Sequence, residues 1–182
     1  MNKTKILVLV DVQKDFIDGA LRNEDAIKAV PSIVKKAEEF KGDYIFVTRD
    51  THDENYLNTP EGKNLPFVHC IKGTDGWNLP YTLAQVLMDK DIREETSIQY
   101  FNKPTFGSFA LAEAIRAIPG DLDIEICGFC TDICVVSNAL LIKAAVYDRA
   151  EIKVLKDLCA GVTKHSHNAA LTTMEKCQIE II

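Results

Sequence analysis

Short apolar runs alternate along this chain with longer segments in which apolar residues recur every three to four positions, and few folds accommodate that order. The first run, Lys5–Val12, is almost continuously apolar, as expected of a central parallel strand that is buried on both faces. Six strands with intervening helices predict an open, mostly parallel α/β sheet, because each parallel return needs a crossover element. The other predicted strands are Tyr44–Thr48, Thr96–Tyr100, Leu122–Cys127, Ile152–Leu155 and Gln178–Ile182, and the predicted helices are Asn23–Phe40, Tyr81–Met88, Ser108–Ile118, Thr131–Tyr147 and Thr163–Lys176.

Two segments depart from this regular pattern. Pro31 lies inside the first helical segment and predicts either a break or a late helix start, with Val30 pushed toward an extended conformation. Thr51–Asn78 has no strong period and is rich in Asp, Asn, Pro and Gly. A stretch of that length without its own structure is usually functional, so we expect it to contribute to a site.

Length and composition predict one ordinary soluble domain. The 182 residues suit a single core and contain no internal repeat, low-complexity stretch or linker, so one domain is predicted over residues 1–182. The net charge of −6 is spread along the chain, which argues against a nucleic-acid or anionic-membrane partner. No apolar run approaches the roughly 20 residues that a membrane span requires.

The N-terminus and the cysteines together predict a cytoplasmic protein. Met1–Lys5 leads into an apolar run that Asp11 interrupts, with no small-residue cleavage site, so we interpret it as a first strand and not a signal peptide. Six cysteines in such a chain indicate a reducing compartment. Four of them lie in or beside apolar stretches and are expected to be buried, inert thiols: Cys70, Cys127, Cys159 and Cys177.

Reactive side chains fall at the ends of several predicted strands. In open α/β sheets, ligands bind at the carboxyl ends of the strands, where the strand order reverses. Asp11 lies near the end of the first strand, Asp50 and His52 follow the second, Lys103 follows the third, and residues 130–134 follow the fourth. This convergence is more informative than any one of these residues alone.

Cys134 is the candidate nucleophile. It is expected in the first turn of the helix that begins near Thr131, where free N–H groups and the helix dipole favour a thiolate and can stabilise an oxyanion. A buried, inert helix cysteine is the alternative. A zinc or cluster site at Cys127, Cys130 and Cys134 is a second alternative, but Cys127 ends a strand and no second close pair completes the ligand set.

Asp11 and Lys103 are candidate partners of that thiol. A carboxylate closing an apolar run is costly to bury unless it is paired, and a general base beside a thiol would account for it; a turn cap is the alternative. Lys103 is a cation among aromatic and turn residues, and it could lower the pKa of the thiol and hold the carboxylate in place. A solvated surface lysine is the alternative there.

The long loop and the strand end before it contain a candidate metal site. Carboxylate and imidazole groups suit zinc, iron or manganese, and Asp50 and His52 are followed by Glu61 and His69. Ordinary polar loop residues are the alternative. His165 and His167 lie at the start of the last helix and are expected on a solvated face.

The sequence resembles the isochorismatase-like cysteine hydrolases, and within them the nicotinamidases. Residues 6–16, ILVLVDVQKDF, are similar to the opening strand and D-x-Q-x-D-F motif of that family. Residues 103–109, KPTFGSF, resemble its K-x-x-x-S-x-F segment, and residues 128–135, GFCTDICV, match its G-x-x-T-D-x-C-V signature. The order and spacing of these motifs agree over nearly the full length.

The resemblance implies a fold, a catalytic triad and an oxyanion hole. The fold would be a Rossmann-like sheet with helices on both faces. Asp11 would be the proton acceptor, Lys103 its electrostatic partner and Cys134 the nucleophile. The peptide bond between Phe129 and Cys130 would be cis, which would place the amides of Cys130 and Cys134 in an oxyanion hole.

The nicotinamidase subgroup further implies a divalent metal, zinc first and iron or manganese as alternatives, and nicotinamide as the substrate. Asp50, His52 and His69 fit the metal ligands of that subgroup, and Glu61 fits the version whose fourth ligand is a glutamate. Phe16 would pack on the substrate ring. A homo-oligomer, either a dimer or a tetramer, is expected from the family. Another small amide or ureido hydrolase of the family is an alternative, and a non-catalytic binding member is a further one.

Overall fold

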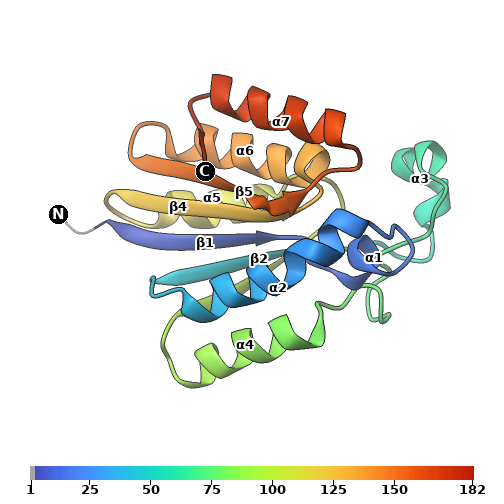
Figure 1. The fold of residues 1–182 in the computed structure, drawn as a ribbon, viewed down its shortest axis with the longest axis horizontal. Coiled ribbons are helices and arrows are strands. Elements are labelled where there is room, and N and C mark those ends of the chain that lie inside the picture. The colour runs from blue at the N-terminus through green and yellow to red at the C-terminus, as the bar shows by residue number, and fades with distance from the viewer. Residues whose placement is uncertain (1–2) are drawn as a thin grey trace.

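The structure, a computed structural model, describes residues 3–182, and within them the strands form one six-stranded sheet in the order β3-β2-β1-β4-β5-β6 (Figure 1). Every strand pairing in this range is parallel, so the sheet predicted to be mostly parallel is parallel throughout. The strands are β1 (Thr4–Val10), β2 (Tyr44–Asp50), β3 (Ser97–Lys103), β4 (Leu122–Phe129), β5 (Ala150–Ala160) and β6 (Glu180–Ile181).

Helices cover both faces of the sheet, as predicted. In Figure 1, α2 and α4 lie together below the strands, whereas α6 and α7 lie above them. The helices are α1 (Lys14–Ile17), α2 (Glu24–Glu39), α3 (Pro60–Asn64), α4 (Tyr81–Ile92), α5 (Phe109–Ala117), α6 (Val136–Val146) and α7 (Lys164–Lys176), with the short turns η1 (Tyr56–Asn58) and η2 (Thr131–Val135). No helix within residues 3–182 combines the length and apolar character needed to cross a bilayer.

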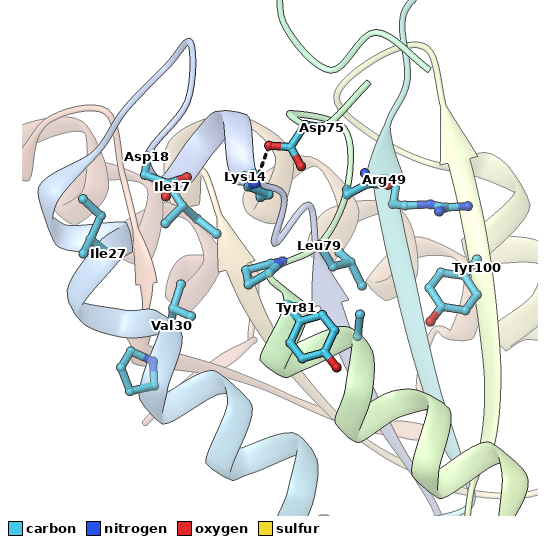
Figure 2. Close-up of a pocket in the computed structure, with 14 residues that line it drawn as sticks. Lys14, Ile17, Asp18, Ile27, Val30, Arg49, Asp75, Leu79, Tyr81 and Tyr100 are labelled. Atoms are coloured by element: carbon cyan, nitrogen blue, oxygen red, sulfur yellow. Dashed lines mark hydrogen bonds and ion pairs between the residues drawn. The ribbon is translucent and has the colours of Figure 1, made fainter. Parts of the chain in front are cut away.

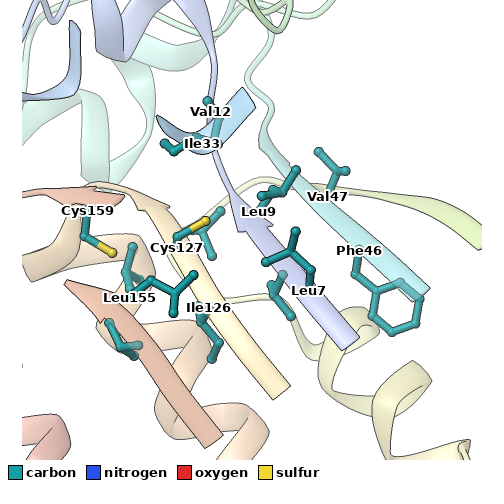
Figure 3. Close-up of a cluster of buried hydrophobic side chains, with 14 of the residues drawn as sticks. Leu7, Leu9, Val12, Ile33, Phe46, Val47, Ile126, Cys127, Leu155 and Cys159 are labelled. Carbon is teal, nitrogen blue, oxygen red and sulfur yellow. The ribbon is translucent and has the colours of Figure 1, made fainter. Parts of the chain in front are cut away.

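The core is built on β1. All five residues from Ile6 to Val10 are fully buried, because β1 is central in the sheet and has helices on both of its faces. Figure 3 shows Leu7 and Leu9 of β1 flanked by Ile126 of β4 and Phe46 of β2. The continuous apolar run seen in the sequence is therefore explained by burial on two faces.

α2 begins at Glu24 and continues through Val30 and Pro31, so the predicted break, the late start and the extended Val30 are all wrong. The helix begins after Asn23, whose side chain accepts hydrogen bonds from the N–H groups of Asp25 and Ala26. Proline removes one helical hydrogen bond, but most helical stability comes from burying an apolar face. That face includes the fully buried Ala26 and Ile33, and its burial outweighs the lost bond.

The long segment 51–78 has more structure than its sequence predicts. It contains η1 and α3, and Thr59 accepts a hydrogen bond from Gly62 N–H to cap α3. A parallel bridge joins His52 to Ile71, which closes the segment into a loop that returns to the sheet edge. Figure 1 shows α3 projecting beyond the carboxyl ends of the strands.

The predicted helix 131–147 is divided into two parts. Residues 131–135 form η2, a π-helical turn, and the regular helix α6 begins only at Val136. π-Helical turns are rare and are frequently found at functional sites. Cys134 therefore lies in a widened turn that immediately precedes α6 and not in the first turn of a regular helix.

Candidate active site

The strand register brings the predicted site residues to one sheet edge. Val10 pairs with Thr48 of β2 and with Gly128 of β4, so Asp11 emerges between these two neighbours. Asp50 pairs with Lys103, the last residue of β3, so the two side chains start from adjacent strand ends. Convergence at the carboxyl edge, predicted from the sequence, follows directly from this register.

Asp11, Lys103 and Cys134 form a buried cluster. Lys103 Nζ lies 2.6 Å from Asp11 Oδ2 and 3.5 Å from Cys134 Sγ. The other carboxylate oxygen of Asp11 accepts a hydrogen bond of 2.7 Å from the Thr48 hydroxyl. Lys103 Nζ also lies 3.7 Å from Asp50 Oδ1, so one ammonium group lies between two carboxylates. Cation, carboxylate and thiol are thus within reach of one another, as a general base and its nucleophile require.

Burial and the neighbouring charges shift the pKa values of this cluster. Burial alone would lower the pKa of Lys103, but the negative charge of Asp11 raises it well above its usual value, so the lysine stays charged. Burial and the charge of Asp11 raise the pKa of Cys134 well above its usual value, against the opposing effect of Lys103. The sequence suggested a lowered pKa, but burial of the thiol outweighs the lysine. The cysteine rests as a thiol, and a base is needed to remove its proton.

Gly128 and a cis peptide bond precede the turn that holds Cys134. The Phe129–Cys130 peptide is cis, as the family resemblance implied. Gly128 has a φ of +126°, and a Cβ there would lie 2.0 Å from the carbonyl oxygen of Val10, so only glycine fits. The carbonyl of Cys130 accepts hydrogen bonds from Ile133 and Val135 N–H, which winds the turn that presents Cys134.

Asp50, His52, Glu61 and His69 form a second cluster, and their ligand atoms all lie within 4.8 Å of one another. Asp50 Oδ2 lies 3.0 Å from His52 Nε2 and 3.4 Å from His69 Nε2. Glu61 Oε1, on α3, lies 3.7 Å from His52 Nε2 and 3.9 Å from His69 Nε2. The long loop thus folds back on the end of β2 and converts four separated residues into one group.

This cluster fits a divalent metal ion. His52 Nε2 is buried without a hydrogen-bond partner, which is costly unless another species binds there. The Nδ1 atom of His69 lies 2.7 Å from the carbonyl oxygen of Phe67, and this contact leaves Nε2 free to point at the carboxylates. Burial alone would raise the pKa of Asp50, but the neighbouring imidazoles of His52 and His69 and the charge of Lys103 lower it well below its usual value, so the carboxyl group is ionised. Two imidazoles and two carboxylates are a donor set that zinc, iron and manganese accept.

Residues of both clusters line one cavity of about 1210 Å³. Cys130 and Cys134 line it, and so do all four residues of the second cluster. Phe16 of α1 is also part of the wall, with its ring centroid 5.7 Å from that of His69. A small molecule in this cavity can therefore contact the thiol, the second cluster and an aromatic ring together.

Two supporting residues were missed in the sequence. Thr48 orients Asp11, and Asn138 of α6 connects the turn that holds Cys134 to the segment after Lys103. The Asn138 side chain donates to the carbonyls of Cys134 and Phe106 and accepts from Ser108 N–H. Asn138 is a polar residue within an otherwise largely apolar helical segment, and this contrast is the sequence feature by which its supporting role could have been recognised.

Other predicted residues lie elsewhere. Cys70, Cys127 and Cys159 are buried as expected, but Cys177 is exposed at the end of α7 because the helix turns it away from the core. His165 is exposed as expected. His167 is not on a solvated face: it is half-buried, and its Nδ1 lies 2.8 Å from the Thr131 hydroxyl, because α7 packs against η2.

A second cavity, of about 680 Å³, contains none of the predicted site residues (Figure 2). It lies between the helices α1, α2 and α4 and the strands β2 and β3. Lys14 and Asp75 form an ion pair at its upper edge, and Arg49 lies near Tyr100 at its side. Cys134 does not line this second cavity.

Comparisons with known proteins agree with this architecture. A model of the isochorismatase domain matches residues 5–182. An "uncharacterized isochorismatase family protein PncA" of Bacillus subtilis (strain 168) is 31% identical in an alignment of length 179, with 92% of this chain and 92% of that protein covered. This chain belongs to the isochorismatase family.

Two solved structures of enzymes are similar to this chain over nearly its full length. The pyrazinamidase/nicotinamidase of Streptococcus mutans UA159 has 30% identity and a TM-score of 0.79, with 98% of this chain and 100% of that chain covered. The pyrazinamidase of Pyrococcus horikoshii, solved in complex with zinc, has 28% identity and a TM-score of 0.74, with 98% of each chain covered. Both relatives are named as pyrazinamidases, and the first is also named as a nicotinamidase.

Proposed function

We propose that this protein is a nicotinamidase that hydrolyses nicotinamide to nicotinate and ammonia. The observation that carries the proposal is the shared cavity, which is lined both by Cys134 and by a cluster of four side chains that could hold a metal ion. The names of the Streptococcus mutans and Pyrococcus horikoshii relatives support the same substrate class.

In the first half of the reaction, Asp11 acts as base and Cys134 as nucleophile. The Asp11 carboxylate accepts the thiol proton as the sulfur attacks the carboxamide carbon, and Lys103 stabilises the charges of this cluster. The main-chain N–H groups of Cys130 and Cys134 stabilise the oxyanion. Protonated Asp11 then returns the proton to the departing ammonia, which leaves a thioester on Cys134.

In the second half, water hydrolyses the thioester. Asp11 accepts a proton from the attacking water, the C–S bond breaks, and the proton returns to the sulfur of Cys134. The acid formed loses its remaining proton to solvent, so the products are nicotinate, a proton and the free thiol, and the protein ends in its starting state.

Asp50, His52, Glu61 and His69 would hold the metal. When bound, a divalent ion offers a Lewis-acid position for the pyridine nitrogen, and zinc is the first candidate because of the zinc complex of the Pyrococcus horikoshii relative. Phe16 would pack against the ring and restrict its orientation. Held at both ends, the substrate presents its carboxamide to Cys134, which is a positioning effect.

The test is ammonia release from nicotinamide. We expect turnover by the unsubstituted protein and none by Cys134→Ala, because the nucleophile is lost. Cys127→Ala is the matched control: Cys127 is buried in the core, and its loss should leave the rate per folded molecule unchanged. Ammonia release by Cys134→Ala, or its absence from the unsubstituted protein, would contradict the proposal.

Another small-amide hydrolase activity is the second candidate. The cavity of about 1210 Å³ has room for amides larger than a pyridine carboxamide. A panel of nicotinamide, pyrazinamide, N-carbamoyl compounds and isochorismate separates the two, with nicotinamide or pyrazinamide expected to give the highest kcat/KM.

Several predictions from the sequence remain proposals. A single domain over residues 1–182 is supported by one continuous core cluster that extends from β1 to α7. The cytoplasmic location and the homo-oligomer stay predictions. Gel filtration with light scattering measures the oligomeric state directly.

A further inference from the structure

Two polar residues of the opening motif have no role in the proposed mechanism. Gln13 and Asp15 follow Asp11 at alternate positions, yet neither lines the cavity. Gln13 is fully buried and Asp15 is half-buried. Buried polar side chains are costly unless their hydrogen bonds are satisfied, so their partners indicate what they do.

Gln13 binds the main chain of Asp50. Its Oε1 accepts a hydrogen bond of 2.7 Å from Asp50 N–H, and its Nε2 donates one of 2.9 Å to Asp50 C=O. The second Nε2 hydrogen donates to the Trp77 carbonyl at 3.0 Å. One amide thus holds both polar main-chain groups of a proposed metal ligand and connects them to the far end of the long loop.

Asp15 binds the main chain beside His69. Its Oδ2 accepts a hydrogen bond of 2.7 Å from the N–H of Cys70, the next residue after His69. Its Oδ1 accepts one of 3.0 Å from Ala20 N–H, and its own N–H donates to the Gly76 carbonyl at 3.0 Å. A Cβ at Gly76 would lie 2.2 Å from Asp15 Oδ2, so the loop main chain is packed directly on this carboxylate.

We propose that Gln13 and Asp15 are positioning residues for the metal site: they set the places of Asp50 and His69 relative to Asp11, which lies on the same short segment. The segment 11–16 then contains the base and the ring-packing Phe16, and through hydrogen bonds it also fixes two metal ligands. Because outer partners of metal ligands tune affinity and geometry, their loss changes metal binding even though neither residue contacts the ion. This inference rests on the metal site of the proposed function.

Lys14 provides a matched control within the same segment. Its ammonium group pairs with Asp75 at the surface, where the two side chains are 33% and 80% exposed (Figure 2). It therefore also connects the segment to the long loop, but through an exposed pair that contributes little. Lys14→Met thus removes a side-chain contact to the same loop without removing one to the main chain of Asp50 or Cys70, so it controls for the loss of a loop contact alone.

The experiment compares Gln13→Met, Asp15→Asn and Lys14→Met with the unsubstituted protein. The Zn²⁺ dissociation constant is measured by chelator competition, and the visible spectrum of the Co²⁺-loaded protein reports ligand geometry. We expect Gln13→Met and Asp15→Asn to bind Zn²⁺ roughly 10–100-fold more weakly, with an altered Co²⁺ spectrum. Lys14→Met should match the unsubstituted protein within about twofold.

Each outcome decides a different statement. If the unsubstituted protein binds Zn²⁺ and both variants bind it equally well with the same Co²⁺ spectrum, the positioning role is wrong while the proposed function stands. If the unsubstituted protein binds no divalent ion, the metal site and this inference are both wrong. Near-UV circular dichroism of each metal-free variant verifies folding, and if Gln13→Met does not fold, the half-buried position of Asp15 makes Asp15→Asn the deciding variant.

Discussion

Lys103 shows how one side chain holds two groups of charges together. Its ammonium lies 2.6 Å from Asp11 Oδ2 and 3.7 Å from Asp50 Oδ1, while Asp50 Oδ2 faces His52 and His69. Asp50 therefore belongs to both clusters, with one oxygen toward each. In a site that is almost entirely buried, removing the lysine leaves two carboxylates without their counter-charge.

We predict that Lys103→Met lowers both stability and activity. Breaking a buried pair by removing one partner costs about 3–5 kcal/mol of unfolding free energy, and we expect kcat/KM to fall by about 10²-fold or more. Urea unfolding and the ammonia assay measure the two effects.

Lys90→Met is the control for that prediction. Lys90 is also buried, but its ammonium donates to the Phe40 carbonyl just after α2, and neither residue lines the cavity. The Lys90→Met variant should have a lower free energy of unfolding but an unchanged kcat/KM. Equal activity loss in both variants would show that Lys103 acts only through folding.

At the scale of elements, the β4–η2–α6 connection presents the nucleophile. β4 approaches the main chain of β1 so closely at Gly128 that no side chain fits, and the chain then turns through η2 before α6 begins. Asn138 of α6 fastens this turn to Phe106 and Ser108. The position of Cys134 thus depends on a strand, a turn and a helix that are packed as a unit.

We predict that Gly128→Ala is severely destabilising. The added Cβ would lie 2.0 Å from the Val10 carbonyl oxygen at a φ of +126°, so the two central strands must separate. We expect a loss of about 3 kcal/mol or more in unfolding free energy, measured by urea titration.

Gly120→Ala is the matched control, since Gly120 has a φ of +78° but no atom within 4 Å of the position that an added Cβ would take. It should cost only the strain of the backbone, about 1–2 kcal/mol. A cost at Gly128 no larger than that at Gly120 would show that the strands accommodate the methyl group.

At the scale of the whole molecule, the second cluster joins parts of the chain that are otherwise separate. It unites the end of β2, the projecting helix α3 and the end of the long loop. An ion bound there would crosslink these parts in the folded state only, and binding to the folded state alone raises stability.

We therefore predict that removing divalent ions lowers Tm. An ion at about 100 times its Kd contributes about 2.7 kcal/mol, which corresponds to roughly 5–10 °C for a chain of this size. Differential scanning calorimetry with and without chelator and added Zn²⁺ measures the shift.

Two variants test the origin of that shift. Glu61→Gln should reduce it, because the variant loses one ligand charge. His165→Ala should leave it unchanged, because His165 is exposed on α7 outside the cluster. An equal shift in the unsubstituted protein and in Glu61→Gln would remove Glu61 from the ligand set.

The α/β architecture and the edge at which the site lies were predictable from the sequence. Apolar runs such as Ile6–Val10 predict buried parallel strands, and the carboxyl ends of parallel strands must meet at one edge. Asp11, Lys103 and Cys134 could be placed there without coordinates. These features depend on local periodicity and on which residues follow each strand.

Other features depend on contacts between distant parts of the chain and could not be predicted in this way. Pro31 is tolerated because α2 buries a whole face, and Cys134 rests as a thiol because the folded core removes water from it. Gln13 hydrogen-bonds to Asp50 and Trp77, which lie 37 and 64 positions further along the chain. No periodic pattern in the sequence connects Gln13 to these two residues. The sequence by itself determined the order of the elements and the reactive residues at their ends. Tertiary packing decided the protonation of Cys134 and the placement of the candidate metal ligands, because both depend on the side chains and main-chain groups that folding brings around each residue.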